Sequence, residues 1–252
     1  MFTVSDNKTI KQHARQVMRE SRPRPVLVTL LFLLILLMFA FFRAKLSGVL
    51  DPVVWEQYYE YALAEDYTAA AEYLYSIQPG TFSSIVIYAI NFITYVLLAG
   101  YVIFTLNAVR GKEPSVYNLL DGFGQFLRVI ILSLLVNIIV SVLSWLLIVP
   151  GIIAAYSYRF ALFNILDHPN MRILDAMSLS RIMMKGHKMR LFKLDLSFLG
   201  YILLSLLFPP LLIWLVPYMY SSWAIFYDEL KLAEFPDGNL LENSNDESRW
   251  DE

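Results

Sequence analysis

The stretch over residues 127–166 constrains the fold more than any other part of this chain. Its forty residues carry only two charges, Arg128 at the edge and Arg159 deep inside, and the pair Pro150-Gly151 interrupts it once. A single helix of this length would measure about 60 Å, roughly twice the ~30 Å hydrocarbon core of a bilayer. An apolar segment of this length must therefore turn back on itself.

The Pro-Gly pair is where we expect that reversal. Pro150 lacks the N–H that a helix needs in its interior, and Gly151 tolerates the backbone angles of a sharp turn. We predict a membrane hairpin, with one span over residues 127–149 and a shorter return span over residues 152–166.

The composition agrees with a membrane protein. Apolar residues make up 58% of the chain and charged residues 17%, against about 45–50% and about 25% in soluble domains. We assign the apolar excess to surface that faces lipid. The chain has no cysteine, which excludes disulfides, thiolate metal sites and cysteine nucleophiles.

Three further apolar stretches extend this arrangement. Residues 26–42 and 82–109 each have the length and composition of one span, whereas residues 194–227 are too long for one untilted span and are broken by three prolines. This last stretch forms either one long kinked span that leaves the C-terminus outside, or a second hairpin of two short arms that returns it inside. We favour the hairpin, which predicts an all-α, polytopic transmembrane helical bundle of about six spans with interfacial amphipathic helices.

The distribution of charge predicts three regions and a topology. The regions are a cytoplasmic basic amphipathic segment (1–25), a transmembrane helical domain (26–228) and an acidic disordered tail (229–252). The domain contains an external acidic, aromatic loop (44–81) and a cytoplasmic basic link (167–193). The first region and the basic link each carry six Lys or Arg, while the external loop carries one Lys. Because basic residues stay on the inner side, we predict a multi-pass protein of the cell membrane with a cytoplasmic N-terminus.

Both basic segments have the pattern of amphipathic helices. The N-terminal helix, with Ser5 as its predicted cap, lies on an anionic membrane surface or serves only as a basic anchor that fixes the topology. A second helix is predicted in the basic link. Its candidate contacts with lipid headgroups are Arg181, Lys185, Lys188 and Arg190.

The external loop combines six acids with six tyrosines. Its aromatic residues recur at helical spacing, which predicts one or two helices that rest on the outer interface with their aromatic faces inward. The loop is either a site for an external ligand or partner, or an aromatic belt packed on the spans.

One candidate polar site lies within the apolar sequence. An Arg near the bilayer centre costs about 2.5–3.5 kcal/mol on insertion scales, so Arg159 should face the bundle interior or water and find partners. It forms either a site for an anionic substrate or lipid headgroup, or a structural pair with an acid or with helix-end carbonyls. We place Tyr156, Asp195 and Asn137 in the same candidate site. Asp195 alternatively caps the first turn of the fifth span.

Motifs for catalysis or cofactor binding are missing from the sequence. There is no His-Glu-x-x-His, no Gly-x-Ser-x-Gly and no Gly-rich nucleotide loop, and the three histidines are far apart. We therefore expect no enzyme activity, no catalytic residues, no metal and no cofactor. The basic segments are explained by topology and lipid contacts, so we also expect no nucleic-acid binding.

The chain resembles the bacterial domain-of-unknown-function family numbered 975. The run M-S-L-S-R-I-M-M-K-G-H-K-M-R-L-F-K-L-D-L-S-F-L-G-Y at residues 177–201 carries the resemblance best. Shorter similar runs are I-K-Q-H-A-R at 10–15, L-I-V-P-G-I-I-A at 147–154, and V-P-Y and F-Y at 216–218 and 226–227. The resemblance implies a polytopic bacterial membrane protein and brings no established activity.

Two functions remain open from the sequence. The first is a non-enzymatic inner-membrane protein that acts through contacts with lipids, with a protein partner or with a second copy of itself. The alternative is a small transporter or lipid-translocating protein with a polar site around Arg159.

Overall fold

The computed structural model describes residues 5–235. Within that range the chain forms helices and no strand, which confirms the all-α class. It divides into two compact units, one comprising Met1–Leu30 with Tyr95–Glu252 and the other Leu31–Thr94. The long helices α2 and α5 each contribute to both units.

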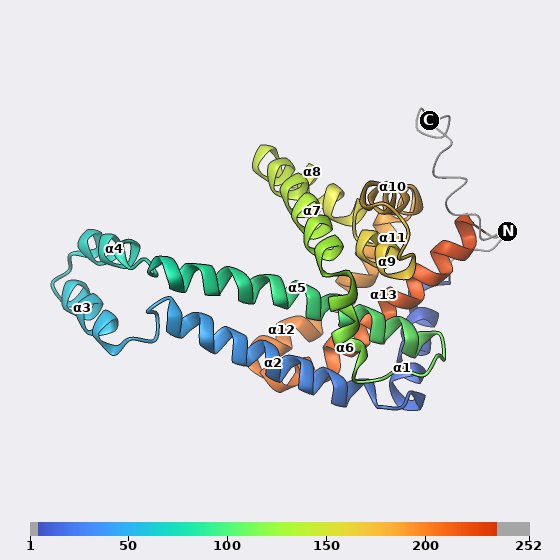
Figure 1. Cartoon of the computed structure of the whole chain (residues 1–252), viewed down its shortest axis with the longest axis horizontal. Coiled ribbons are helices and arrows are strands. Elements are labelled where there is room, and N and C mark those ends of the chain that lie inside the picture. Colours follow the sequence, from blue (N-terminus) through green and yellow to red (C-terminus); the bar gives the residue numbers. More distant parts are fainter. Residues whose placement is uncertain (1–4, 236–252) are drawn as a thin grey trace. The chain divides into compact units, whose positions relative to one another are not determined.

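The elements follow one another along the chain as coloured in Figure 1. The α-helices are α1 Asn7–Glu20, α2 Pro25–Leu46, α3 Pro52–Leu63, α4 Tyr67–Ser76, α5 Thr81–Val109, α6 Asn118–Asp121, α7 Phe126–Leu146, α8 Ile148–Ser157, α9 Ala161–Asp167, α10 Ile173–Met183, α11 Lys188–Leu196, α12 Leu199–Leu207 and α13 Leu212–Glu234. Two short 3-10 helices, η1 Gly122–Gln125 and η2 Pro209–Leu211, lie between them.

Four helical segments are long and apolar enough to cross a membrane. In the described part of the chain these are Pro25–Leu46, Thr81–Val109, Asn118–Leu146 and Ile148–Asp167. By length and composition they indicate a membrane protein. The fifth and sixth predicted spans are not among them, because residues 194–227 form the nine-residue α12, the turn η2 and a less apolar α13.

The central hairpin is present, but its turn lies earlier than predicted. Helix α7 ends at Leu146, and Leu147 has an extended backbone with φ −156° and ψ 137°. Pro150 lies in the first turn of α8, where the missing N–H costs no helical hydrogen bond. Gly151 permits close packing instead of the reversal, since a Cβ there would lie 2.7 Å from Ser144 Cα.

The smaller unit contains the predicted external loop. The two helices of this loop, α3 and α4, begin with side-chain caps. Asp51 accepts from the Val53 N–H and Asp66 accepts from the Ala69 N–H, both at 3.0 Å. The rings of Tyr61 and Tyr73 join α3 to α4, with their centroids 5.9 Å apart. Helix α3 buries none of its residues. Because burial within the protein does not test contact with a membrane, the inward aromatic face of α3 stays a prediction.

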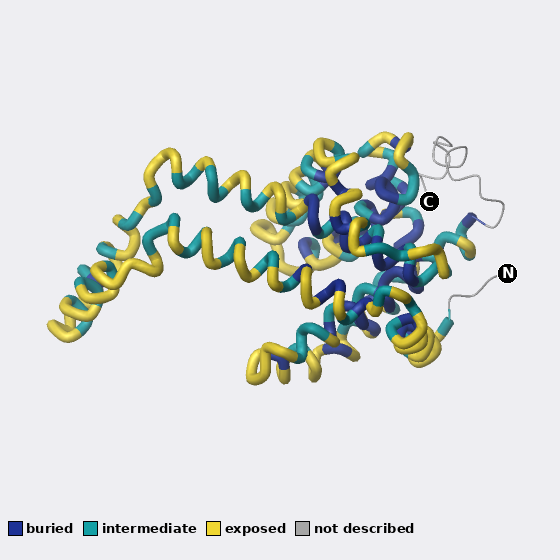
Figure 2. Tube along the Cα trace, turned by 60° about the horizontal axis from the view of Figure 1, so that its bottom comes forward, coloured by how far each residue is buried: buried dark blue, intermediate teal, exposed yellow. Residues whose placement is uncertain are grey.

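The core of the larger unit gathers several short helices around α13. Buried residues of α1, α9, α10, α11 and α13 belong to one apolar cluster, seen as the dark blue segments in Figure 2. Two glycines let the α6–η1 segment pack closely on α5. A Cβ on Gly100 would lie 2.7 Å from the Asn118 carbonyl oxygen and still closer to that of Leu119, and one on Gly122 would clash with the Val96 carbonyl oxygen.

Both described ends of the chain lie together in this unit. Helix α1 packs along α13 and buries Ile10 and Ala14. Its cap is Asp6, which accepts from the Thr9 N–H at 3.1 Å, so the prediction of Ser5 as the cap is wrong. The Ser5 N–H instead donates to Glu229 Oε2 at 2.7 Å.

The prediction of a disordered tail from residue 229 is wrong for residues 229–234, which are helical. Helix α13 continues to Glu234, and Leu230 is fully buried in the core. Apolar residues that follow Asp228 at helical spacing explain the extra turns. The remainder of the predicted tail, residues 236–252, lies outside the described part of the chain.

Candidate functional site

Arg159 lies at a break in the return helix. The chain leaves α8 at Ser157 and enters α9 at Ala161, and the turn between them is closed by the Ala161 N–H donating to the Tyr158 carbonyl at 3.1 Å. The turn directs Arg159 toward α13. Its guanidinium stacks on Trp223, with the guanidinium carbon 3.9 Å from the ring centroid. A cation over an indole face at this distance is stabilised by the ring quadrupole.

Asp195 lies at the N–H edge of the same tryptophan. Its Oδ1 accepts from Trp223 Nε1 at 2.7 Å, and its Oδ2 accepts from the Tyr156 hydroxyl at 2.9 Å. The structure therefore brings together Arg159, Tyr156 and Asp195, three of the four residues predicted to share a polar site. Trp223 is the residue that joins them, and the sequence offered no signal for it.

The geometry corrects two structural predictions for this site. Asp195 belongs to the last turn of α11 and does not cap α12, whose N-terminal residue Phe198 makes no side-chain capping bond. Arg159 forms no ion pair with Asp195 or with any other acid among residues 5–235. The tryptophan ring occupies the place that we expected an acid or carbonyl groups to take.

Asn137 is not part of this arrangement. It is exposed on α7, and its side-chain amide donates to the Ser133 carbonyl of its own helix at 2.7 Å. Such a bond satisfies a polar side chain in an apolar helix without a tertiary partner.

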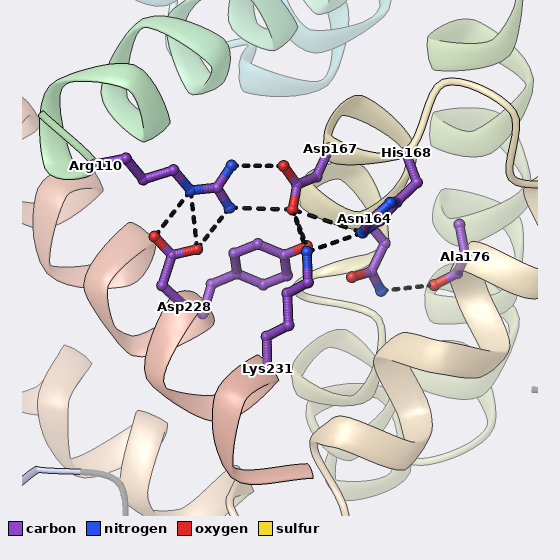
Figure 3. A network of polar contacts seen from close by, with 8 residues as sticks. Arg110, Asn164, Asp167, His168, Ala176, Asp228 and Lys231 are labelled. Atoms are coloured by element: carbon purple, nitrogen blue, oxygen red, sulfur yellow. Dashed lines mark hydrogen bonds and ion pairs between the residues drawn. The ribbon is translucent and has the colours of Figure 1, made fainter. Parts of the chain in front are cut away.

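A second polar cluster, which the sequence analysis missed, joins three helix ends (Figure 3). Arg110 follows the last residue of α5 and donates to two carboxylates at once. Its closest contacts are 2.5 Å to Asp167 at the end of α9 and 2.6 Å to Asp228 in α13. Burial alone would lower the pKa of Arg110, but the hydrogen bonds and charges of Asp228 and Asp167 outweigh it and raise that pKa further above its ordinary value.

Lys231 extends this cluster toward His168. The Lys231 ammonium lies 2.7 Å from Asp167 Oδ2 and 2.9 Å from His168 Nε2, and the Tyr227 hydroxyl donates to the same Asp167 oxygen at 3.2 Å. Burial, and next the charge of Lys231, lower the pKa of His168. The imidazole is thus held neutral, with Nε2 free to accept from the ammonium.

A signal for this cluster was present in the sequence. Arg110, Asp167 and Asp228 are each the first charged residue after an apolar run. If the three runs end at the same membrane boundary, these charges must lie at the same depth. We call Arg110, Asp167, Asp228, Lys231 and His168 the boundary cluster.

The predicted headgroup contacts lie on α10, α11 and the turn between them. Arg181 and Lys185 are exposed, and Lys188 is partly exposed. Across residues 5–235 no acid pairs with these three side chains. Arg190, the fourth predicted contact, is partly buried and has interactions of its own.

The carboxylates of both clusters are already engaged by donors. Asp195 accepts from two neutral donors, and Asp167 is neutralised by cations. No group of three His, Asp or Glu in the described range could hold a metal ion. The Arg159 guanidinium can attract an anion, because no carboxylate within residues 5–235 accepts from its N–H groups.

Comparisons with known proteins give a family and no activity. The family model described as "Protein of unknown function (DUF975)" matches residues 1–164 and 145–234. The comparison with curated proteins found no match, and neither did the comparison with solved structures. The resemblance carried by residues 177–201 is therefore confirmed, and the chain belongs to the DUF975 family of proteins of unknown function.

Proposed function

We propose that this chain is a non-enzymatic integral membrane protein that acts through lipid or protein contacts at the inner membrane. The observation that carries the proposal is the surface of α10 and α11. These helices bury apolar residues in the core, including Ala176, Met183 and Leu191. With the turn between them they present Arg181, Lys185 and Lys188, which have no acidic partner among residues 5–235. Cations placed beside an inner leaflet attract anionic lipids, at about 1 kcal/mol for each.

The boundary cluster supports the proposed topology. In the proposed path α5 crosses the membrane inward, α7 crosses it outward, and α8 with α9 crosses it inward again. Arg110, after α5, and Asp167, at the end of α9, must then lie on the same side of the membrane. Their direct contact agrees with this path. The basic residues of the first region and of the basic link favour the cytoplasm for that side.

The same cluster favours a C-terminal segment that returns to the cytoplasmic side. Asp228 in α13 meets Arg110, and Glu229 meets Ser5. Helix α12 has nine residues, about 14 Å of helix, which is less than half of the hydrocarbon core. We infer that residues 194–227 form the second hairpin of two short arms, which completes the six apolar segments of the predicted bundle.

Charge reversal tests the proposed lipid contacts. In a variant that combines Arg181→Glu, Lys185→Glu and Lys188→Glu, we expect weaker retention of phosphatidylglycerol and unchanged retention of phosphatidylcholine, measured on the purified protein by native mass spectrometry. The matched control combines Arg181→Lys, Lys185→Arg and Lys188→Arg and should retain phosphatidylglycerol as the wild type does. Equal retention by the reversed and the control variants would contradict the proposal.

The absence of cysteine makes the topology directly testable. A single cysteine at Glu56 in the external loop should react with a membrane-impermeant maleimide on intact cells. Single cysteines at Asn170 and Leu232 should react only after the cells are permeabilised. Labelling of the Leu232→Cys variant on intact cells would show that the C-terminal segment forms one long span.

Lipid translocation around Arg159 is the second candidate function. It is favoured by the observation that this guanidinium has an aromatic partner and no described acid. The probe is a fluorescent phosphatidylglycerol in proteoliposomes, with dithionite to report on the outer leaflet. Translocation by the wild type that is lost in Arg159→Gln and kept in Arg159→Lys would establish this function. Equal dithionite protection with and without protein would exclude it.

A further inference from the structure

A cavity of about 440 Å³ lies outside the polar clusters described above. It is a partly open pocket lined by α1, the start of α2, α12, η2 and α13. Its wall includes Arg15, Arg19, Tyr201, Leu211, Trp214 and Tyr218. This volume falls within the roughly 300–1,000 Å³ of typical ligand pockets.

One wall of the cavity is basic. Arg15 and Arg19 lie four residues apart on α1 and so share one face of that helix. Arg15 Nε donates to the Tyr218 hydroxyl at 3.0 Å, which fixes the guanidinium beside the cavity. No acid lines the cavity, and neither arginine forms an ion pair within residues 5–235.

A third cation lies one helical turn away from Arg15. Lys11 Nζ donates to the Ser197 carbonyl at 3.3 Å and lies 4.6 Å from the centre of the Phe198 ring. Burial, and next the charge of Arg15, lower the pKa of Lys11. Three cations along one face of α1 repel one another, and an anion between Arg15 and Arg19 would relieve this repulsion.

The opposite wall of the cavity is apolar. Leu211, Trp214 and Leu215 of η2 and α13 supply it, and Met18 and Val26 add further apolar lining. Trp214 is 66% exposed, and the neighbouring Leu207 and Phe208 are exposed as well. An apolar wall that continues into an exposed apolar surface suits a ligand that is itself partly embedded in lipid.

We propose that this cavity binds one anionic glycerophospholipid, with its phosphate on Arg15 and Arg19 and the start of an acyl chain against Leu211, Leu215 and Trp214. The two arginines supply donors for the phosphate oxygens. The apolar wall distinguishes a lipid from a soluble phosphate. This proposal rests on the proposed function, because it requires the chain to lie in a membrane, but the cavity is separate from the surface of α10 and α11, so the variants of the two surfaces test them separately.

Saturable binding of phosphatidylglycerol to the full-length protein in detergent tests the site. The wild type should retain one such lipid more tightly than phosphatidylcholine, measured by native mass spectrometry during lipid titration. The variant R15Q/R19Q should weaken this binding by roughly ten- to a hundredfold, since it removes hydrogen bonds from charged donors. The control R22Q/R24Q removes two cations of the same segment that do not line the cavity and should bind as the wild type does.

A second measurement keeps the test valid if R15Q/R19Q fails to fold. Phosphatidylglycerol with brominated acyl chains should quench the tryptophan fluorescence of the wild type at low lipid occupancy, and the W214F variant should lose most of this quenching. Equal quenching in the two proteins would overturn the proposal. Binding of glycerol 3-phosphate as tight as that of the lipid would also overturn it, because the site would then recognise a soluble phosphate.

Discussion

Removal of the Arg110 guanidinium is the most informative perturbation of this protein. In Arg110→Gln, the two carboxylates that now lie 2.5 Å and 2.6 Å from one cation would both lose it, and Asp167 would keep the Lys231 ammonium. Asp228 would lose its only ion-pair partner among the described residues. We expect a marked loss of stability from this single change.

The magnitude follows from burial. The exposed fractions of the side chains are 21% for Arg110, 12% for Asp167 and 23% for Asp228. Exposed pairs contribute about 0–1 kcal/mol, and breaking a fully buried pair costs about 3–5 kcal/mol. The boundary cluster lies between these limits, so we expect a loss of about 2–3 kcal/mol. For a chain of this size the apparent Tm should fall by about 4–12 °C.

The assay is thermal unfolding of the purified protein in detergent, followed by tryptophan fluorescence. Lys112→Gln is the matched control, because Lys112 is exposed at the same end of α5, and its effect should stay within about 0.5 kcal/mol.

A double variant shows whether unpaired charge causes the loss. Arg110→Gln with Asp228→Asn removes the cation and one stranded carboxylate together. Its loss should be smaller than the sum of the two single losses by at least about 1 kcal/mol. Additive losses, within about 0.3–0.5 kcal/mol, would refute the argument that these charges stabilise one another.

Two further predictions concern the same unit. The folded state holds His168 neutral with a pKa below its ordinary value, whereas the unfolded chain takes up the proton near pH 6.5. The contribution of neutral His168 to stability should therefore be fully present above about pH 6.5 and be lost as the pH drops through the lower folded pKa. The Tm should depend less on pH between 7.5 and 5 in His168→Gln than in the wild type. An unchanged pH profile of the Tm would refute this. Gly100→Ala should lower the Tm by several degrees because its Cβ would overlap the Leu119 carbonyl oxygen, at a cost of about 1–3 kcal/mol. Gly124→Ala meets nothing within 4 Å and should leave the Tm unchanged; equal shifts in the two variants would contradict the packing argument.

Four long apolar helices could be predicted from the sequence because lipid imposes a simple rule. A helix that crosses a bilayer must be long and apolar along its whole length, so a linear pattern is sufficient to find it. The turn of the central hairpin was harder to place. A proline is tolerated in the first turn of a helix as well as in a reversal, and the extended backbone at Leu147, before the proline, decides between them.

The polar partners could not be predicted in this way. Arg159 is 64 residues from Trp223, and Arg110 is 118 residues from Asp228. Such pairs depend on how the helices pack, which a single sequence does not specify. Arg159 also shows that a partly buried charge cannot be paired by searching the sequence for opposite charges alone. Its partner is the face of the Trp223 indole ring, whereas an acid was one of the partners considered.

The boundary cluster nevertheless follows a rule that the sequence could supply. A charge that ends an apolar run is held at the membrane boundary, so all charges of this kind on one side lie within a thin layer. Opposite charges in that layer need only a small lateral movement to pair. Arg110, Asp167 and Asp228 each follow an apolar run and do meet. For other chains with several apolar runs, the first charged residue beyond each run is therefore the place to look for contacts that join the spans.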